Sequence, residues 1–290
     1  MSDLPLVERL EPHRLRPREF NLIRRQVYER FGIDLEGKEV LVAGRLGKKL
    51  RELGTNSFAE YFDYVQQDAT GEALTGMVDA LTTNHTSFFR EPQHFEYLRR
   101  VILPAFAHAT PVRIWSAACS TGEEPYSIAF TLLEELGAAA HAIASVLATD
   151  VSTRVLEQAK RGLYPASRFQ HVPVPQMRRH LLKGTGDAEG QYLVKKEPRS
   201  LVRFERLNLM EDVSRVGLFP VIFCRNVMIY FDQPTQQNVV NRLAAQLTPG
   251  GYLLIGHAES LNGIAHSLEY LCPATYRKPD SRFPATRSRR

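Results

Sequence analysis

The sequence has few cysteines and no long apolar run. Its 290 residues include three cysteines, Cys119, Cys224 and Cys272, which lie too far apart for a paired metal-binding motif. We therefore expect neither a disulfide framework nor a metal site, and we predict reduced thiols in a cytoplasmic protein. No apolar run approaches the roughly 20 residues that cross a bilayer. Residues 1–20 also lack the apolar core of a signal peptide.

The charge is modest overall but uneven along the chain. The formal net charge is +5 at pH 7. Many of the basic groups fall within residues 9–51: Arg14, Arg16, Arg18, Arg24, Arg25, Arg30, Lys38, Arg45, Lys48, Lys49 and Arg51. A basic face attracts an anionic partner, either nucleic acid or an acidic protein surface. A solvated helical face without a partner explains the pattern equally well.

Residues 18–109 follow a helical period. Apolar residues recur at spacings of three and four along the first segment, at Phe20, Ile23, Val27 and Phe31. Gly32 and Gly54 are typical helix ends, Ser57 is a typical N-cap, and Pro92 suits the start of a further helix. The pattern predicts a basic, all-helical N-terminal domain over residues 1–90 and a linker helix over 91–110.

The period changes after Pro111. Five short runs rich in branched or aromatic residues follow, namely VRIWSAA, SVLATD, VRFERLN, PVIFCRN and GYLLIGH, and helical patterns separate several of them. Alternating strands and helices predict an α/β fold, a doubly wound and mainly parallel sheet over residues 111–278. Residues 164–200 break the alternation with a helix and a probable hairpin, which indicates an inserted small β subdomain. Residues 279–290 form a basic tail that we expect to be disordered.

The turn between the first of these strands and its helix favours one cofactor over others. It consists of small residues and is followed by Glu123 and Glu124 in the first turn of the helix. Carboxylates there face the positive helix end, which explains Glu123 without any ligand. The pair would nevertheless repel a pyrophosphate, which normally uses that helix end. S-adenosylmethionine carries a sulfonium and an ammonium and no phosphate, so the turn suits it better than NAD. Asp150, which ends the second strand, is placed to bind ribose hydroxyls.

Five segments resemble the motifs of the CheR family, the methyltransferases that esterify glutamates on bacterial chemotaxis receptors. They are residues 82–91 (TTNHTSFFRE), 116–129 (SAACSTGEEPYSIA), 148–164 (ATDVSTRVLEQAKRGLY), 223–232 (FCRNVMIYFD) and 249–261 (PGGYLLIGHAESL). In the last segment His257 and Glu259 occupy familiar places. The resemblance runs in order from Arg18 to Arg277 and implies a Rossmann-like methyltransferase domain.

The resemblance also implies a set of site residues. The cofactor-binding set is Asn84, Thr86, Arg90, Glu124, Asp150, Asn208, Leu209, Arg225 and Asn226. Whether Glu123 shares the role of Glu124 stays open. A structural ion pair at the strand end is the alternative for Arg225. Phe88 and Phe89 are expected to pack at the domain junction rather than to contact ligand.

The chemistry asks little of the protein. A glutamate with a pKa near 4.3 is already a nucleophilic carboxylate at pH 7, so attack on the sulfonium methyl needs no general base. The reaction requires alignment and the exclusion of water. Arg90 and Tyr230 are the candidate catalytic residues, which would orient the incoming carboxylate, Arg90 by a charge-assisted hydrogen bond. S-adenosylhomocysteine would be the product of the cofactor.

The expected partners are the cytoplasmic domains of chemotaxis receptors. The basic helices would dock on methylation helices that display glutamates. In the family, the inserted subdomain can bind a peptide at the receptor C-terminus as an added strand, and the turn at residues 184–190 (GTGDAEG) resembles members that do so. A plain solvent loop is the alternative. We expect a cytoplasmic monomer that is recruited to receptor arrays, without nucleic acid or membrane insertion.

Two other functions compete with receptor methylation. An RNA methyltransferase would share the cofactor domain, but the chain has CRNVMIY where amino-directed nucleic-acid enzymes carry Asn/Asp-Pro-Pro-aromatic. Its basic helices also lack interleaved aromatic residues for stacking bases. A non-catalytic receptor-binding module would not need to retain Asn84, Arg90, Asp150 and Asn226. The receptor itself stays open, because other signalling arrays use the same motifs.

Overall fold

The computed structural model describes residues 14–106, 111–170 and 172–280. The chain divides into two compact units: the first comprises residues 1–84 with 230–232, and the second comprises residues 85–229 and 233–290. The helical pattern predicts a first domain that ends at residue 90, slightly beyond this boundary. Of the tail expected at 279–290, residues 281–290 lie outside the described part of the chain.

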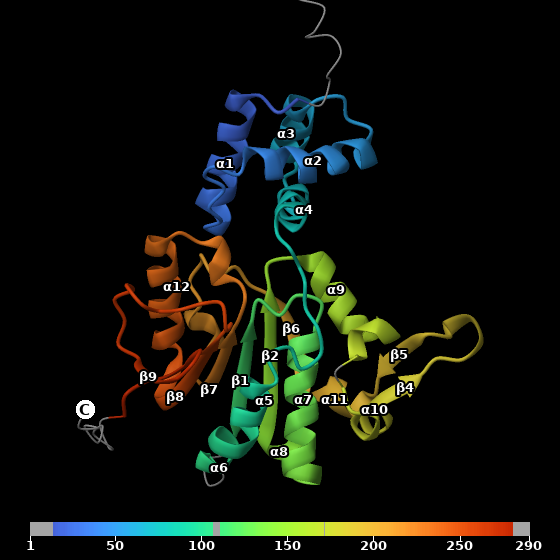
Figure 1. Ribbon diagram of the computed structural model, residues 1–290, viewed down its shortest axis with the longest axis vertical. Helices are drawn as coiled ribbons and strands as arrows, with labels where there is room; N and C mark the ends of the chain where they lie inside the picture. Colours follow the sequence, from blue (N-terminus) through green and yellow to red (C-terminus); the bar gives the residue numbers. More distant parts are fainter. Residues whose placement is uncertain (1–13, 107–110, 171, 281–290) are drawn as a thin grey trace, which may run out of the picture. The chain divides into compact units, whose positions relative to one another are not determined.

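The first unit is helical (Figure 1). Its helices are α1 (Pro17–Phe31), α2 (Glu39–Leu53), α3 (Phe58–Gln67) and α4 (Glu72–Leu81). The stripe of α1 is buried, as its spacing predicts. Gly32 and Gly54 end α1 and α2 in the left-handed conformation, both at φ 69°, which glycine adopts without strain. The Ser57 side chain accepts a hydrogen bond from the Glu60 N–H at 3.1 Å, so it is the N-cap of α3.

Residues 230–232 join the first unit although they come from much later in the chain. Ile33 forms a β-bridge with Phe231, and the Asp34 N–H donates to the Tyr230 carbonyl at 2.8 Å. The Tyr28 hydroxyl donates to Asp232 at 2.9 Å. A periodicity argument cannot detect such a contact, because it joins segments about two hundred positions apart.

The second unit contains a seven-stranded sheet in the order β6-β2-β1-β7-β8-β10-β9. Its strands are β1 (Val112–Ala117), β2 (Ala144–Asp150), β6 (Val202–Arg206), β7 (Phe219–Cys224), β8 (Leu247–Ile255), β9 (Glu269–Cys272) and β10 (Thr275–Arg277). The first five strands in this order pair in parallel. Strand β10 pairs antiparallel with β8 on one side and with β9 on the other. The mainly parallel, doubly wound sheet is therefore confirmed. The strand order reverses at β1, where β1 pairs with β2 on one side and β7 on the other, and ligands of such sheets bind at this point.

Helices cover this sheet (Figure 1). They are α7 (Glu123–Leu136), α8 (Ala140–Ile143), α9 (Thr153–Arg161) and α12 (Gln233–Ala245), with short 3-10 turns at Gly137–Ala139, Ser214–Val216 and Met228–Tyr230. The segment expected as a linker helix consists of α5 (Gln93–Tyr97), a π-helical turn (Leu98–Ile102) and α6 (Leu103–Ala105). Phe95, Leu98 and Ile102 are buried in one cluster with Ile114 and Phe223 of the sheet. This segment is therefore part of the second unit's core rather than a free connection.

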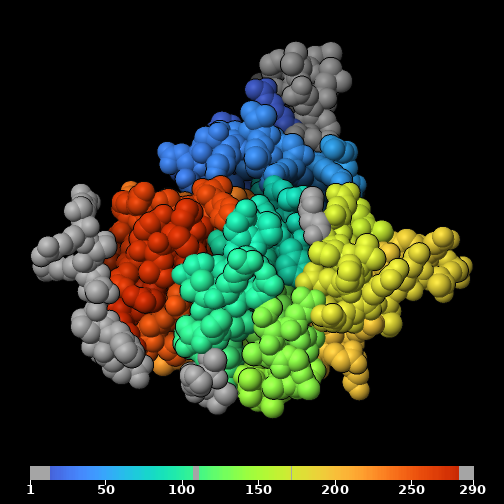
Figure 2. Space-filling view, turned by 60° about the horizontal axis from the view of Figure 1, so that its bottom comes forward, coloured from blue at the N-terminus to red at the C-terminus, as the bar shows by residue number. Residues whose placement is uncertain are grey.

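The insertion forms a separate three-stranded antiparallel sheet, in the order β3-β5-β4. Its elements are β3 (Leu163–Pro165), a 3-10 turn (Ala166–Phe169), α10 (Val174–His180), β4 (Leu181–Lys183), a second 3-10 turn (Gly186–Ala188), β5 (Gln191–Val194) and α11 (Lys196–Leu201). The predicted helix and hairpin are present, and the GTGDAEG segment is the hairpin turn. Figure 2 shows this insertion, in yellow, as a lobe of the second unit.

Within the described ranges, no helix combines the length and apolar character needed to span a membrane.

Candidate functional site

The turn after β1 has an unusual backbone. Ala118, Ser120 and Gly122 adopt positive φ angles of 63°, 50° and 96°. Positive φ at a non-glycine residue costs roughly 1 kcal/mol and persists only where the surroundings impose it. Here Asp150 imposes it in part, because its carboxylate accepts the Ser120 N–H at 2.9 Å and the Ser152 N–H at 3.0 Å. Asp150 thus holds the turn against the end of β2.

Gly122 is required by packing. A Cβ at this position would lie 2.7 Å from the Ala159 Cβ and 2.8 Å from the Tyr164 hydroxyl. Both distances are shorter than Cβ atoms tolerate, so only glycine lets α7 begin this close to α9 and the insertion. This glycine therefore serves the close contact of α7 with α9 and the insertion.

The adjacent carboxylates Glu123 and Glu124 have different surroundings. Glu123 is fully buried and accepts the Thr121 hydroxyl at 2.6 Å, and burial raises its pKa. Glu124 is partly exposed, accepting the Ser116 hydroxyl at 2.7 Å and an Arg225 N–H at 2.8 Å. Glu124 therefore lies beside the strand ends, while Glu123 is enclosed. The two carboxylates thus differ in surroundings, and whether Glu123 shares the cofactor role of Glu124 stays a prediction.

Arg225 follows β7 and is the centre of an ion network. Its guanidinium donates to Glu124 at 2.8 Å, to Glu91 at 2.9 Å and to the Arg90 carbonyl, and its side chain is only 2% exposed. The guanidinium carbon also lies 5.7 Å from the centre of the Phe95 ring. The structural ion pair that the sequence offered as the alternative for Arg225 is therefore present. A contact between Arg225 and the cofactor stays a prediction.

Two histidines lie near the Glu91 carboxylate of this network, namely His94 and His257. Burial acts to raise the pKa of Glu91, but Arg225, Asn226 and the His257 N–H together hold it below its ordinary value. His94 is buried, and burial with the Arg225 charge lowers its pKa to about 3. The three side chains offer possible metal ligands within 4.8 Å of one another. Because Arg225 already occupies the Glu91 carboxylate, a second cation is disfavoured there, and we assign no metal to the cluster.

Asn226 is held in a positive φ of 57° by a buried carboxylate. Glu259 accepts backbone N–H bonds from Asn226 at 2.9 Å, from Met228 at 2.8 Å and from Gly256 at 2.6 Å. Burial raises its pKa, and these N–H donors act in the opposite direction. The sequence noted Glu259 only as part of a motif. Its signal was an acidic residue just after a buried strand in a segment without Lys or Arg.

The segment from His85 to Glu91 carries two predicted site residues, Thr86 and Arg90. Thr86 is buried, and the Arg90 side chain donates to the His85 carbonyl at 2.7 Å. Phe89 and Glu91, on either side of Arg90, have positive φ angles of 52° and 57°. Strain of this kind clusters at functional sites.

The rings of Phe88 and Phe89 pack inside the second unit. Phe88 stacks on Phe169 of the insertion at 4.4 Å, and Phe89 meets Phe95 at 5.0 Å. Both rings pack as predicted, but they do so inside the second unit and not at the junction of two domains.

The remaining predicted residues fall into both units. Asn208 and Leu209 follow β6, and the Leu207 N–H donates to the Asp150 carbonyl at 3.0 Å, so these strand ends are adjacent. Asn84 and Tyr230 belong to the first unit. There the Tyr230 hydroxyl donates to the Thr83 carbonyl and accepts the Thr83 N–H, both at 3.0 Å. The cofactor contacts of all these residues stay predictions.

The carboxylates at the strand ends fit a cationic, ribose-bearing cofactor. Glu124 and Asp150 present carboxylates at the ends of neighbouring strands, and a carboxylate has further acceptor sites beyond its present partners. Such oxygens suit an ammonium group and ribose hydroxyls. Arg225 is balanced by two carboxylates, so this edge favours positive charge over a phosphate.

Comparisons with known proteins agree with this geometry. A family model described as "CheR methyltransferase, SAM binding domain" matches residues 84–276, and "CheR methyltransferase, all-alpha domain" matches residues 18–82. "Chemotaxis protein methyltransferase 2" of Pseudomonas aeruginosa is 43% identical over 260 residues, covering 89% of this chain and 92% of that protein. "Chemotaxis protein methyltransferase" of Escherichia coli is 40% identical over 261 residues, covering 89% of each chain.

Proposed function

The chain belongs to the CheR methyltransferase family, and we propose that the site at the ends of β1, β2, β6 and β7 serves the methylation of receptor glutamates. The protein is an S-adenosylmethionine-dependent protein-glutamate O-methyltransferase that acts on chemotaxis receptors. The observation that carries the assignment is the agreement of two family models, which match in order residues 18–82 and 84–276. The carboxylates at the strand ends are what such a cofactor requires.

The protein contributes binding and alignment to the reaction. When bound, S-adenosylmethionine supplies a methyl group activated by a sulfonium, and a glutamate carboxylate is a sufficient nucleophile at neutral pH. Glu124 would hold the methionine end, and Asp150 and Asn208 the ribose and adenosine. Arg90 and Tyr230 would orient the incoming carboxylate. Because methylation removes the substrate's negative charge, the ester should bind Arg90 more weakly than the acid, which aids product release.

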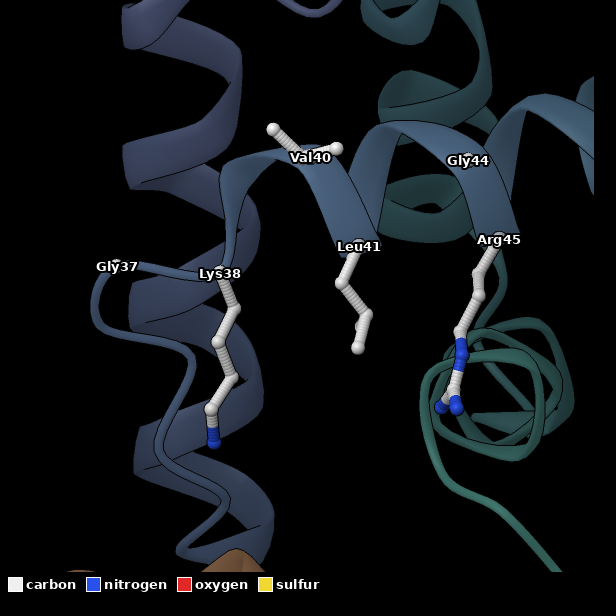
Figure 3. A pocket seen from close by; sticks show the side chains of 6 residues that line it. All are labelled: Gly37, Lys38, Val40, Leu41, Gly44 and Arg45. Atoms are coloured by element: carbon white, nitrogen blue, oxygen red, sulfur yellow. The ribbon is translucent and has the colours of Figure 1, made fainter.

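Helix α2 is a suitable docking surface for the receptor's methylation helices. Gly37, Lys38, Val40, Leu41, Gly44 and Arg45 line a groove of about 580 Å³ (Figure 3). Val40 is 88% exposed, and a Cβ at Gly44 would contact nothing within 4 Å, so part of this groove is apolar and open. The Lys48 side chain, which α2 also carries, is 76% exposed. An apolar face beside exposed cations fits a helix that displays glutamates.

The insertion is a suitable place for a receptor's C-terminal peptide. Strand β4 is an edge of its sheet and its Leu182 is exposed. A groove of about 640 Å³ lies beside it and includes five basic residues: Lys160, Lys195, Lys196, Arg199 and Arg203. An added strand would pair with the free edge, and the basic groove would attract a terminal carboxylate.

Methyl-labelled S-adenosylmethionine tests the assignment directly. The purified protein would be incubated with it and with receptor-containing membranes or RNA, and the macromolecular fraction would then be treated with mild alkali. Label that enters membrane protein and leaves as volatile methanol identifies a carboxyl ester, as expected. Label that stays in RNA through alkali would overturn the assignment in favour of a nucleic-acid methyltransferase.

A further inference from the structure

The segment that carries Thr86 is held by the insertion. The Arg168 guanidinium, from the 3-10 turn of the insertion, donates from Nη1 to the Thr86 carbonyl at 2.7 Å. Two residues further on, Phe88 is fully buried, stacked on Phe169 at 4.4 Å and edge-on to Tyr164 at 5.1 Å. The inserted subdomain, which is not part of the main sheet, therefore supplies two of the contacts that hold this segment.

The same Arg168 nitrogen faces the buried carboxylate at the start of α7. Arg168 Nη1 lies 3.4 Å from Glu123 Oε1. The other Glu123 oxygen accepts the Thr121 hydroxyl, while Oε1 is buried and makes no hydrogen bond to the described residues. A fully buried carboxylate with one hydrogen bond depends strongly on a nearby cation. Arg168 is the cation that the structure provides at this oxygen.

Two further contacts join these elements into one framework. The Tyr164 hydroxyl donates to the Thr121 carbonyl at 2.6 Å, which fixes the insertion to the turn after β1. The Ser127 hydroxyl accepts the Phe89 N–H at 2.9 Å and donates to the Glu123 carbonyl at 2.7 Å. The insertion, the start of α7 and the Thr86 segment thus meet around Glu123.

We propose that Arg168 is a positioning residue for cofactor binding, which sets the Thr86 segment against the turn after β1 through Glu123. The inference rests on the proposed function, because it takes Thr86 and this turn as parts of the cofactor pocket. It goes further in giving the inserted subdomain a part in the cofactor site, and in giving Glu123 a role distinct from that of Glu124. The Arg168 side chain contacts the backbone carbonyl of Thr86 and need not touch the cofactor.

Four variants separate positioning from simple charge compensation. They are Arg168→Met, Arg168→Lys, Glu123→Gln and the double variant Arg168→Met/Glu123→Gln, with Arg179→Met as the control. Arg179 is an arginine of the same insertion, 63% exposed. The measurements are the Kd for S-adenosylhomocysteine by titration calorimetry, the Tm, and kcat and KM for S-adenosylmethionine.

Arg168→Met should raise the Kd and KM about tenfold, since a charge-assisted hydrogen bond is lost, with kcat changed less. Its Tm should fall because Glu123 stays buried without a cation. The double variant should regain Tm, because a neutral amide replaces the carboxylate, yet keep the weak Kd. Arg168→Lys should restore much of the affinity, and Arg179→Met should match the wild type.

Two results would overturn the inference: a folded Arg168→Met protein that binds S-adenosylhomocysteine as tightly as the wild type, or a double variant that recovers both Tm and affinity. The second would reduce Arg168 to a counter-charge for Glu123. A wild-type protein that binds no S-adenosylhomocysteine would instead contradict the proposed function, so the two failures are distinguishable.

Discussion

The two units use charged side chains in opposite ways. In the first unit the ion pair of Arg25 and Glu29 joins side chains that are 77% and 57% exposed. In the second unit Arg225 is 2% exposed and lies between Glu91 and Glu124, which are 16% and 12% exposed. Water and salt screen the first kind of pair, and the second kind is screened little. The exposed pair of the first unit therefore suits encounter with a partner, while the buried Arg225 network of the second holds the strand ends in place.

Replacing the central cation should have the largest effect. Arg225→Met leaves two partly buried carboxylates without their counter-ion, and breaking such a pair costs about 3–5 kcal/mol of unfolding free energy. Urea unfolding and calorimetry with S-adenosylhomocysteine would measure the loss of stability and of binding. Arg25→Met is the matched control in the first unit and should leave both unchanged. Equal effects of the two variants would refute the contrast between the units.

Acid should destabilise the second unit through His94. Its pKa is about 3 in the fold, against an ordinary value of 6.5, so at intermediate pH the unfolded chain binds a proton that the folded chain does not. The free energy of unfolding should therefore fall as the pH is lowered from about 6.5 to about 3, by at most about 1.4 kcal/mol per pH unit.

His94→Leu should reduce this dependence when urea unfolding is followed between about pH 5 and 6.5, above the range in which exposed carboxylates titrate. The lowered pKa of Glu91 also disfavours the fold in acid, but it acts at lower pH. An unchanged slope in His94→Leu would show that other groups cause the acid sensitivity.

Tyr230 tests whether residues 230–232 serve only the first unit's structure. Tyr230→Phe removes both hydrogen bonds between the hydroxyl and the Thr83 backbone. If the hydroxyl orients the incoming carboxylate, kcat should fall about tenfold while KM for S-adenosylmethionine changes less. Steady-state kinetics with receptor membranes measure both. Intact turnover would remove Tyr230 from the candidate catalytic residues.

The smallest effect is expected at two cations of α2, the exposed Lys48 and the partly exposed Lys49. Lys48→Ala/Lys49→Ala should raise the KM for receptor about two- to fivefold at low salt, and the difference should disappear at high salt. The Tm should not change. Arg100→Ala removes a similarly exposed cation, 71% exposed, from the second unit and is the control. A salt-independent change in KM would contradict electrostatic docking on α2.

Much of the fold follows from local sequence patterns. The spacing of Phe20, Ile23 and Val27 predicts the buried face of α1, and the five apolar runs correspond to β1, β2, β6, β7 and β8. Two contacts that join distant segments were not predictable in this way: the bridge between Ile33 and Phe231, and the burial of residues 93–105 against the sheet. Periodicity reports which face of an element is apolar, but not which partner covers that face.

The sequence by itself determined the two-part architecture, the family and the preference for a cationic cofactor, because periodicity, motif order and residue charge are local properties. Only the tertiary structure decided the different surroundings of Glu123 and Glu124. Successive residues of a helix point about 100° apart, so one neighbour can face the insertion and the other the strand ends. Arg168 and Arg225, both distant in sequence, then complete two separate networks. Burial and ion pairing depend on this packing, which no local pattern records.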